Sequence, residues 1–238
     1  MNKTCLIRQT AGIGDIFFCQ KIGYYFQSLG YDIIWPIKKV FNYIPMYIKN
    51  FTYVDENSDY DYKEIYLKNL SSKEIVSDNN YIFIPLDGHN LRHNSVMRSK
   101  YCLVNIDCSD WKNYFNFERN IKKENELFYD VLGVREDEEF IFLNRNFASP
   151  PDIFVKPINI STNYRIIEMK IIDNFTIFDW CKVLEKTKAI ITVETSLNYI
   201  IEKLNLSTNN LQMFSKWNPA NYNHIMGLFK KEWKYNYD

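Results

Sequence analysis

The sequence is poor in glycine, proline and histidine, with seven, seven and three of them in 238 residues. So little glycine and proline argues against a collagen-like or low-complexity chain. With three histidines, no HExxH motif and no paired His and carboxylate pattern, a metal-based mechanism is not indicated, and we expect no metal site and no cofactor. No GxSxG motif or local Cys–His signature is present either, so hydrolase chemistry has no basis in the sequence.

The five cysteines are odd in number, and none belongs to a CxxC pair. This pattern indicates neither a disulfide framework nor a zinc ribbon, and it favours a reducing compartment. The first ten residues hold too short an apolar run for a signal peptide, and no stretch approaches the roughly 18 apolar residues of a membrane span. We therefore expect a cytoplasmic protein without a membrane span.

The sequence does contain enough apolar material for a substantial core. Hydrophobic residues make up 46% of the chain and aromatic residues 17%, and the formal net charge is zero. A chain of this length fits one large domain or two small ones. Its neutral charge gives no global electrostatic reason to expect a nucleic acid partner.

The first half of the chain alternates between strand and helix patterns. A buried strand is expected first, and a helix with apolar residues at helical spacing then ends at Gly30. The expected strands are 3–9, 32–35, 62–67 and 81–86, and the expected helices are 14–29 and 37–49. This alternation is typical of a parallel sheet covered by helices.

The segment 89–138 is polar and mixed, and its last helix is closed by Gly133, where we place the domain boundary. A second alternating pattern follows, with strands expected at 139–144, 165–170, 189–193 and 211–214 and helices at 177–187, 194–204 and about 222–235. The sequence therefore predicts an α/β fold of two Rossmann-like halves, 1–133 and 134–238, that face a cleft. Such a cleft is the default place for a ligand.

The turn after the first strand contains Gly12, Gly14 and Asp15. Glycines let the backbone approach a ligand, and a helix start presents unpaired amides. The turn is not a dinucleotide fingerprint, because its third glycine would fall at Phe17, and it is not a P-loop, because no Gly-Lys-Ser/Thr follows. A carboxylate such as Asp15 at a helix start is either a dipole-complementing residue or a general base.

A second group of polar residues, Glu194, Thr195 and Ser196, follows the buried strand AIITV and opens a helix. Taken alone, such residues are usually helix caps. Open α/β sheets, however, bind ligands at the carboxyl ends of their strands, which is where this group and the glycine turn are both expected. Their coincidence favours a diphosphate or ribose site.

Two further groups follow predicted strands. Asn144 and Arg145 come after the first strand of the second half, where the arginine either clamps phosphate oxygens or is an ordinary surface residue. His89 and Arg92 follow the strand at 81–86, where they line the cleft on the acceptor side or are solvated loop residues.

The stretch LIRQTAGIGDI, a strand that ends in Arg followed by a small-residue turn closing in Gly-Asp, resembles the start of the ADP-heptose:lipopolysaccharide heptosyltransferases and related GT-B glycosyltransferases. The strand AIITV with Glu194, Thr195 and Ser196 is similar to the family's strand followed by an acidic residue, Thr/Ser and Gly. Leu197 stands where that glycine is expected, and the family's nearby His is missing. The likeness covers about 1–30 and 175–205 of a chain that is compact for this class, as in viral or phage versions.

The resemblance implies an inverting, metal-independent glycosyltransferase that uses a nucleotide-sugar donor. Asp15 would deprotonate an acceptor hydroxyl, and Gly12 and Gly14 would let donor and acceptor come close. The remaining residues would bind the donor. Glu194, Thr195 and Ser196 would bind its ribose and diphosphate, and Arg145 would neutralise charge on the departing nucleotide. Asn144 is a further donor-binding residue, and Met169 would border the base.

The acceptor implied is a glycan or, in a phage, a hydroxymethylated DNA base. Two alternatives remain open at the level of sequence. One is a nucleotide- or sugar-binding module that has lost turnover, and the other is an interaction protein that docks through aromatic residues such as those in the 217–237 tail.

Overall fold

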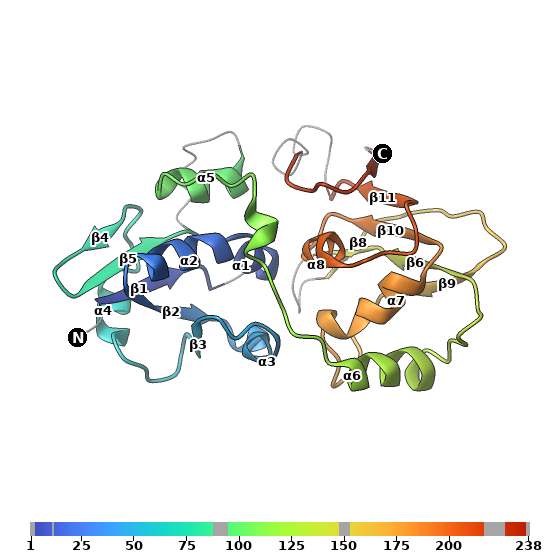
Figure 1. Cartoon of the computed structure of the whole chain (residues 1–238), viewed down its shortest axis with the longest axis horizontal. Helices are drawn as coiled ribbons and strands as arrows, with labels where there is room; N and C mark the ends of the chain where they lie inside the picture. The colour runs from blue at the N-terminus through green and yellow to red at the C-terminus, as the bar shows by residue number, and fades with distance from the viewer. Residues whose placement is uncertain (1–2, 11, 88–94, 148–152, 217–226, 237–238) are drawn as a thin grey trace. The chain divides into compact units, whose positions relative to one another are not determined.

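The computed structural model describes residues 3–10, 12–87, 95–147, 153–216 and 227–236 (Figure 1). The chain divides into two compact units, residues 1–118 and 119–238. Each unit is built on its own mainly parallel five-stranded sheet with helices packed against it. The predicted fold class, α/β with two Rossmann-like halves, is confirmed.

The sheet of the first unit has the strand order β3-β2-β1-β5-β4. All neighbours pair in parallel except β4 and β5, which are antiparallel. In chain order the strands are β1 Lys3–Arg8, β2 Tyr31–Ile37, β3 Thr52–Asp55, β4 Val76–Ser77 and β5 Tyr81–Pro85. Strand β1 is central and buried from Thr4 to Arg8, as predicted for the first strand.

The helices of the first unit are short. They are α1 Ile13–Phe18, α2 Gln20–Ser28, the 3₁₀ helix η1 Lys39–Phe41, α3 Ile44–Tyr47, α4 Lys63–Lys68, α5 Val96–Leu103 and the 3₁₀ helix η2 Trp111–Asn113. The helix expected over 14–29 forms as α1 and α2, which meet at Cys19. The helix expected over 37–49 forms only as η1 and α3.

The strand predicted at 62–67 is wrong, because these residues form α4. These six residues mix polar and apolar side chains. So short a pattern is compatible with a strand and equally with a helix that buries one residue. In α4, Tyr66 is buried and meets Phe83 of β5 edge to face with 5.9 Å between ring centroids, whereas Leu67 is exposed. Packing of Tyr66 in a cluster with Leu6 and Phe83 of the sheet therefore favours the helical conformation of this segment.

The sheet of the second unit has the strand order β12-β11-β10-β6-β9, and all its pairs are parallel. The strands are β6 Phe140–Asn144, β9 Arg165–Glu168, β10 Ala189–Val193, β11 Leu211–Phe214 and β12 Trp233–Asn236, and β7 Asn146–Phe147 and β8 Phe154–Val155 form a separate antiparallel pair. The helical elements are α6 Ile121–Asn125, the π-helix η3 Glu126–Val131, the 3₁₀ helix η4 Ile177–Trp180, α7 Cys181–Lys186 and α8 Leu197–Lys203.

The prediction of a closing helix around 222–235 is wrong for its last residues. Trp233–Asn236 is the edge strand β12, which pairs in parallel with β11. Residues 222–226 lie outside the described residues. Trp233 is buried and stands opposite Leu211 in this ladder, so tertiary pairing overrides the amphipathic pattern on which the helix was predicted.

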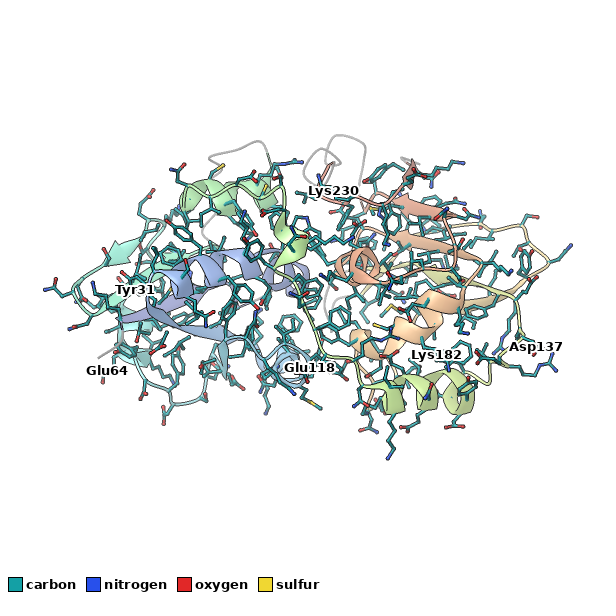
Figure 2. The ribbon with its side chains drawn as sticks, in the orientation of Figure 1. Tyr31, Glu64, Glu118, Asp137, Lys182 and Lys230 are labelled. Carbon is teal, nitrogen blue, oxygen red and sulfur yellow. The ribbon has the colours of Figure 1, made fainter. Side chains whose placement is uncertain are left out.

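Residues 119–133 belong to the second unit, whereas the sequence placed the boundary after Gly133. Helix α6 and its continuation η3 pack on η4 and α7. Lys182 of α7, labelled in Figure 2, donates hydrogen bonds to Asn125 Oδ1 (2.9 Å) and Tyr129 Oη (2.7 Å). Its ammonium also lies 4.0 Å from the centroid of the Tyr129 ring. These contacts hold the segment to the unit that follows it.

All five cysteines are free thiols. Cys5, Cys19 and Cys181 are fully buried, and burial raises the pKa of each of these thiols. Cys108 is partly buried, which raises its pKa as well, whereas Cys102 is exposed.

We expect a native protein sample to show one fast-reacting thiol. At pH 8, a maleimide or an aromatic disulfide should label Cys102 first, Cys108 more slowly, and the three buried cysteines at least about 100-fold more slowly, since only the exposed thiolate reacts. In denaturant all five should react. Peptide mapping by mass spectrometry identifies the labelled sites, and fast labelling that survives in a Cys102→Ser variant would contradict this expectation.

Candidate active site

The first unit has its topological switch point between β1 and β5, where the chain order of the strands changes direction. The two strands are parallel and in register, with Arg8 opposite Pro85, so their carboxyl ends lie at the same edge. Ligands of open α/β sheets bind outside the carboxyl ends of strands at such a point. The turn with Gly12 and Asp15 follows β1 at this edge.

Gly12 is required by the geometry of the turn. Its φ of +78° is in the left-handed region, which side chains other than glycine rarely adopt. A Cβ atom on this residue would lie 2.3 Å from Oδ2 of Asp15. The Gly12 carbonyl accepts hydrogen bonds from the amides of Asp15 (2.8 Å) and Ile16 (3.1 Å), which starts α1. Gly14 lies in the first turn of that helix.

Asp15 forms an ion pair with Lys100 of α5, with Nζ 3.1 Å from Oδ1. The side chain of Asp15 is 27% exposed, whereas that of Lys100 is 5% exposed. Lys100 also donates to Gln9 Oε1 (2.5 Å) and to the carbonyl oxygen of Leu86 (2.9 Å). The carboxylate that the sequence singled out is thus solvent-accessible and bound to a buried cation.

Arg8 lies at the same edge, at the end of β1. Its guanidinium donates to Asp87 Oδ1 (2.5 Å) and to the carbonyl oxygen of Leu70, and lies 5.6 Å from the centroid of the Phe83 ring. With all these partners, Arg8 joins the end of β1 to the residues after β5 and α4. Its role in the structure is to hold the edge on which Asp15 is placed.

The switch point of the second unit lies between β6 and β10. When its strands are numbered along the chain from β6, their order in the sheet is 2-1-3-4-5, and the order changes direction between the first and the third. Asn144 ends β6 and is buried there. Its amide nitrogen donates to Oγ1 of Thr192 (3.1 Å) and of Thr195 (3.3 Å). The structure therefore brings together Asn144 and Thr195, which the sequence proposed separately.

Thr195 is held on its other side by Asn198 of α8. Asn198 Oδ1 accepts from the backbone amide of Thr195 (2.9 Å) and from its hydroxyl (3.4 Å). Glu194 is buried beside it, and its amide bonds to the Phe214 carbonyl (3.0 Å). Ser196 is the residue before α8, and its side chain makes no capping hydrogen bond.

Arg145 lies at this edge but its charge is engaged. Its guanidinium binds Glu168 in a bidentate arrangement, with hydrogen bonds of 2.8 and 2.7 Å, and this bonding raises the pKa of Arg145. Met169 directly follows β9. Its backbone amide donates to the Leu143 carbonyl of β6 (2.8 Å), which extends the pairing of the two strands by one residue. The Met169 carbonyl accepts from Asn146 Nδ2 (2.9 Å), so Arg145 and Met169 lie on adjacent segments.

The remaining predicted residues, His89 and Arg92, lie outside the described residues. Lys100 and Asn198 were not predicted from the sequence. Asn198 is four residues after Glu194, on the expected helix, so its spacing was a usable signal. Lys100 gave no such signal, because its partners are far away in the sequence.

The described part of the chain contains no group of three or more His, Cys, Asp and Glu side chains placed to hold a metal ion. Among its helices, none is long and apolar enough to cross a bilayer.

The folded chain is similar to solved glycosyltransferase structures. A glycosyl transferase family 9 protein from Veillonella parvula DSM 2008 matches with a TM-score of 0.54 and 10% identity, over 98% of this chain and 85% of that one. This likeness shows that the two chains share a fold. No protein-family model matches the chain, and no curated protein matches its sequence.

Weaker similarity extends to TibC, described as a bacterial iron-containing dodecameric glycosyltransferase from enterotoxigenic E. coli H10407. It matches with a TM-score of 0.48 and 10% identity, over 92% of this chain and 60% of TibC. The heptosyltransferase TibC in complex with ADP-D-beta-D-heptose gives a TM-score of 0.49 over the same shares.

Proposed function

We propose that the chain is a metal-independent, inverting glycosyltransferase that moves a sugar from a nucleotide-sugar donor to an acceptor hydroxyl. The observation that carries the proposal is the accessible carboxylate of Asp15 at the switch point of a fold shared with a family 9 glycosyltransferase. A fixed, accessible carboxylate at hydrogen-bond reach of a substrate hydroxyl is what general base catalysis requires.

In the proposed reaction, the acceptor hydroxyl loses its proton to Asp15 while its oxygen attacks the anomeric carbon. The bond from that carbon to the diphosphate oxygen breaks, and its electron pair leaves with the nucleoside diphosphate. One displacement of this kind inverts the anomeric centre. The products are the new glycoside, the nucleoside diphosphate and protonated Asp15, which returns its proton to water.

The second unit supplies the donor-binding residues in this proposal. The Thr195 hydroxyl and the polar groups of Asn144 and Glu194 lie at one strand edge, where ribose and diphosphate oxygens would find donors and acceptors. Ser196 has a hydroxyl that no capping bond uses. Arg145 would stabilise the departing diphosphate by exchanging Glu168 for a phosphate oxygen, because guanidinium binds both in the same bidentate manner.

The acceptor is proposed to be a hydroxyl of a glycan. The zero net charge of the chain favours a glycan over DNA, because duplex binding depends on neutralising phosphates with basic residues. A hydroxymethylated DNA base is the alternative acceptor, and the proposed site chemistry is the same for both.

A thermal-shift panel tests the proposal. The full chain is heated with ADP-, UDP-, GDP- and dTDP-sugars and with the matching free sugars, with and without EDTA. A true donor should raise Tm by mass action, since it binds only the folded chain. Release of nucleoside diphosphate in the presence of mixed saccharides should then be seen with that donor and should persist in EDTA.

Four outcomes are informative. Binding without turnover would indicate the inactive binding module instead. Turnover that disappears in EDTA would contradict metal independence, and retention of the anomeric configuration by NMR would contradict the single displacement. No shift with any nucleotide sugar would favour the interaction protein.

A further inference from the structure

Lys100 lies on α5, in the segment to which the sequence analysis gave no role. Its ammonium is almost completely buried and has three oxygen partners: Asp15 Oδ1, Gln9 Oε1 and the Leu86 carbonyl. The ammonium donates hydrogen bonds to Gln9 and to the Leu86 carbonyl and forms an ion pair with Asp15. A buried cation is unfavourable unless it is bonded in this way, which makes its position well defined.

The three partners come from the segments that form the switch point of the first unit. Gln9 directly follows β1, Leu86 directly follows β5, and Asp15 is in the first turn of α1. Gln9 is itself fixed, because its carbonyl oxygen accepts from the indole N–H of Trp35 (3.2 Å). The ammonium of Lys100 is thus tied to the rigid sheet edge and reaches Asp15 from there.

The same contact determines how the Asp15 carboxylate is oriented. Oδ1 is bonded to Lys100, and Oδ2 lies against Gly12, where only a hydrogen atom fits. Among the residues that the structure describes, Lys100 is the cation paired with this carboxylate. Rotation of the carboxylate is restricted on both sides, yet 27% of the side chain remains exposed.

We propose that Lys100 is a positioning residue for Asp15: by pairing with Oδ1 it fixes the orientation of the carboxylate that would take the proton of the acceptor hydroxyl. This inference rests on the proposed function. When Asp15 takes the acceptor proton, Lys100 keeps Gln9 and Leu86 as partners, so the ammonium stays in place through the step. A misplacement of about 1 Å in such a group lowers a rate by roughly 100-fold.

A double-mutant cycle tests the proposal. Lys100→Met and Asp15→Asn are made singly and together, and kcat, donor KM and Tm are measured with the donor identified in the panel. Lys100→Met alone should lower kcat by about 10- to 100-fold with donor KM changed by less than about threefold. In the Asp15→Asn background it should lower the residual rate by less than about twofold, because no base remains to be positioned.

Lys21 supplies a matched control. It is partly buried in the first unit, and its ammonium donates to the carbonyl oxygen of Asp107 (2.7 Å) and to the carboxylate of Asp110. It makes no contact with Asp15. Lys21→Met should therefore leave kcat within about twofold even where it lowers Tm, as surface and structural changes away from the site do.

If Lys100→Met does not fold, Lys100→Arg carries the same cycle, because it keeps the charge but moves the donors. An equal loss of kcat in the wild-type and Asp15→Asn backgrounds would show a general structural effect and overturn the Lys100 inference while the proposed function stands. If the wild-type protein transfers no sugar, both the Lys100 inference and the proposed function are overturned. This outcome is measured on the wild-type protein alone.

Discussion

Asp15→Asn is expected to lower kcat by about 100- to 10,000-fold and to leave the donor Kd within about threefold. Asparagine has the size of aspartate, and its carbonyl oxygen can still accept from Lys100, so the fold and the neighbouring contacts are kept. The amide, however, cannot take a proton from the acceptor. The loss should therefore appear in turnover and not in donor binding.

The measurement is nucleoside diphosphate release under saturating donor, with donor Kd taken from calorimetry. Asp110→Asn is the control, because Asp110 is also a partly exposed carboxylate of the first unit bound to a lysine, the partly buried Lys21. It should retain wild-type turnover within about twofold. An Asp15→Asn protein with more than about a third of wild-type kcat would remove Asp15 from the base role.

Glu202→Ala is expected to cost the second unit about 3–5 kcal/mol of stability. Glu202 of α8 is fully buried, and its carboxylate accepts from the amides of Lys230 (3.0 Å) and Lys231 (3.1 Å) and from the Trp233 indole N–H (2.9 Å). Alanine removes the acceptor of the buried Trp233 indole N–H and of two part-buried amides, and a buried donor left unsatisfied costs about 1–3 kcal/mol. Lys230, labelled in Figure 2, begins the segment that leads to β12.

Urea unfolding measures the free energy, with the two units fitted as separate transitions if they do not coincide. Hydrogen exchange gives a local readout, since the amides of Lys230 and Lys231 should lose protection in Glu202→Ala. Glu126→Ala, at an exposed position of η3, should change stability by less than about 0.5 kcal/mol. Unchanged protection at Lys230 and Lys231 would contradict the role assigned to Glu202.

The parts of the fold that could be predicted are those set by long apolar runs. The buried strands β1, β6 and β10 were expected nearly at their bounds, because continuous apolar residues between turn signals favour central parallel strands. The short elements and the edge strand β12 could not be predicted in this way. The residues of α4 and β12 adopt their conformations because Tyr66 and Trp233 pack on the neighbouring sheet, which the local pattern does not contain.

In the candidate site, too, some contacts could be predicted from the sequence and others could not. Parallel topology alone places Asn144 and Thr195 at one edge, so their proximity was predictable, and the bond between them is 3.3 Å long. The engagement of Arg145 by Glu168 was not predictable, since Glu168 ends β9, a strand whose neighbour is known only from the sheet order. Which roles these side chains have in catalysis remains a prediction.

The hydrogen bond from Lys100 to Gln9 joins residues 91 positions apart in the sequence. Closing so long a loop has an entropic cost that local turns do not have, so contacts of this kind form late and slow the folding of the unit. The ammonium reaches Asp15 only after β1, β5 and α5 have assembled. A folding intermediate that already contains the glycine turn and α1 would therefore lack the ion pair, and the appearance of that pair would mark completion of the first unit.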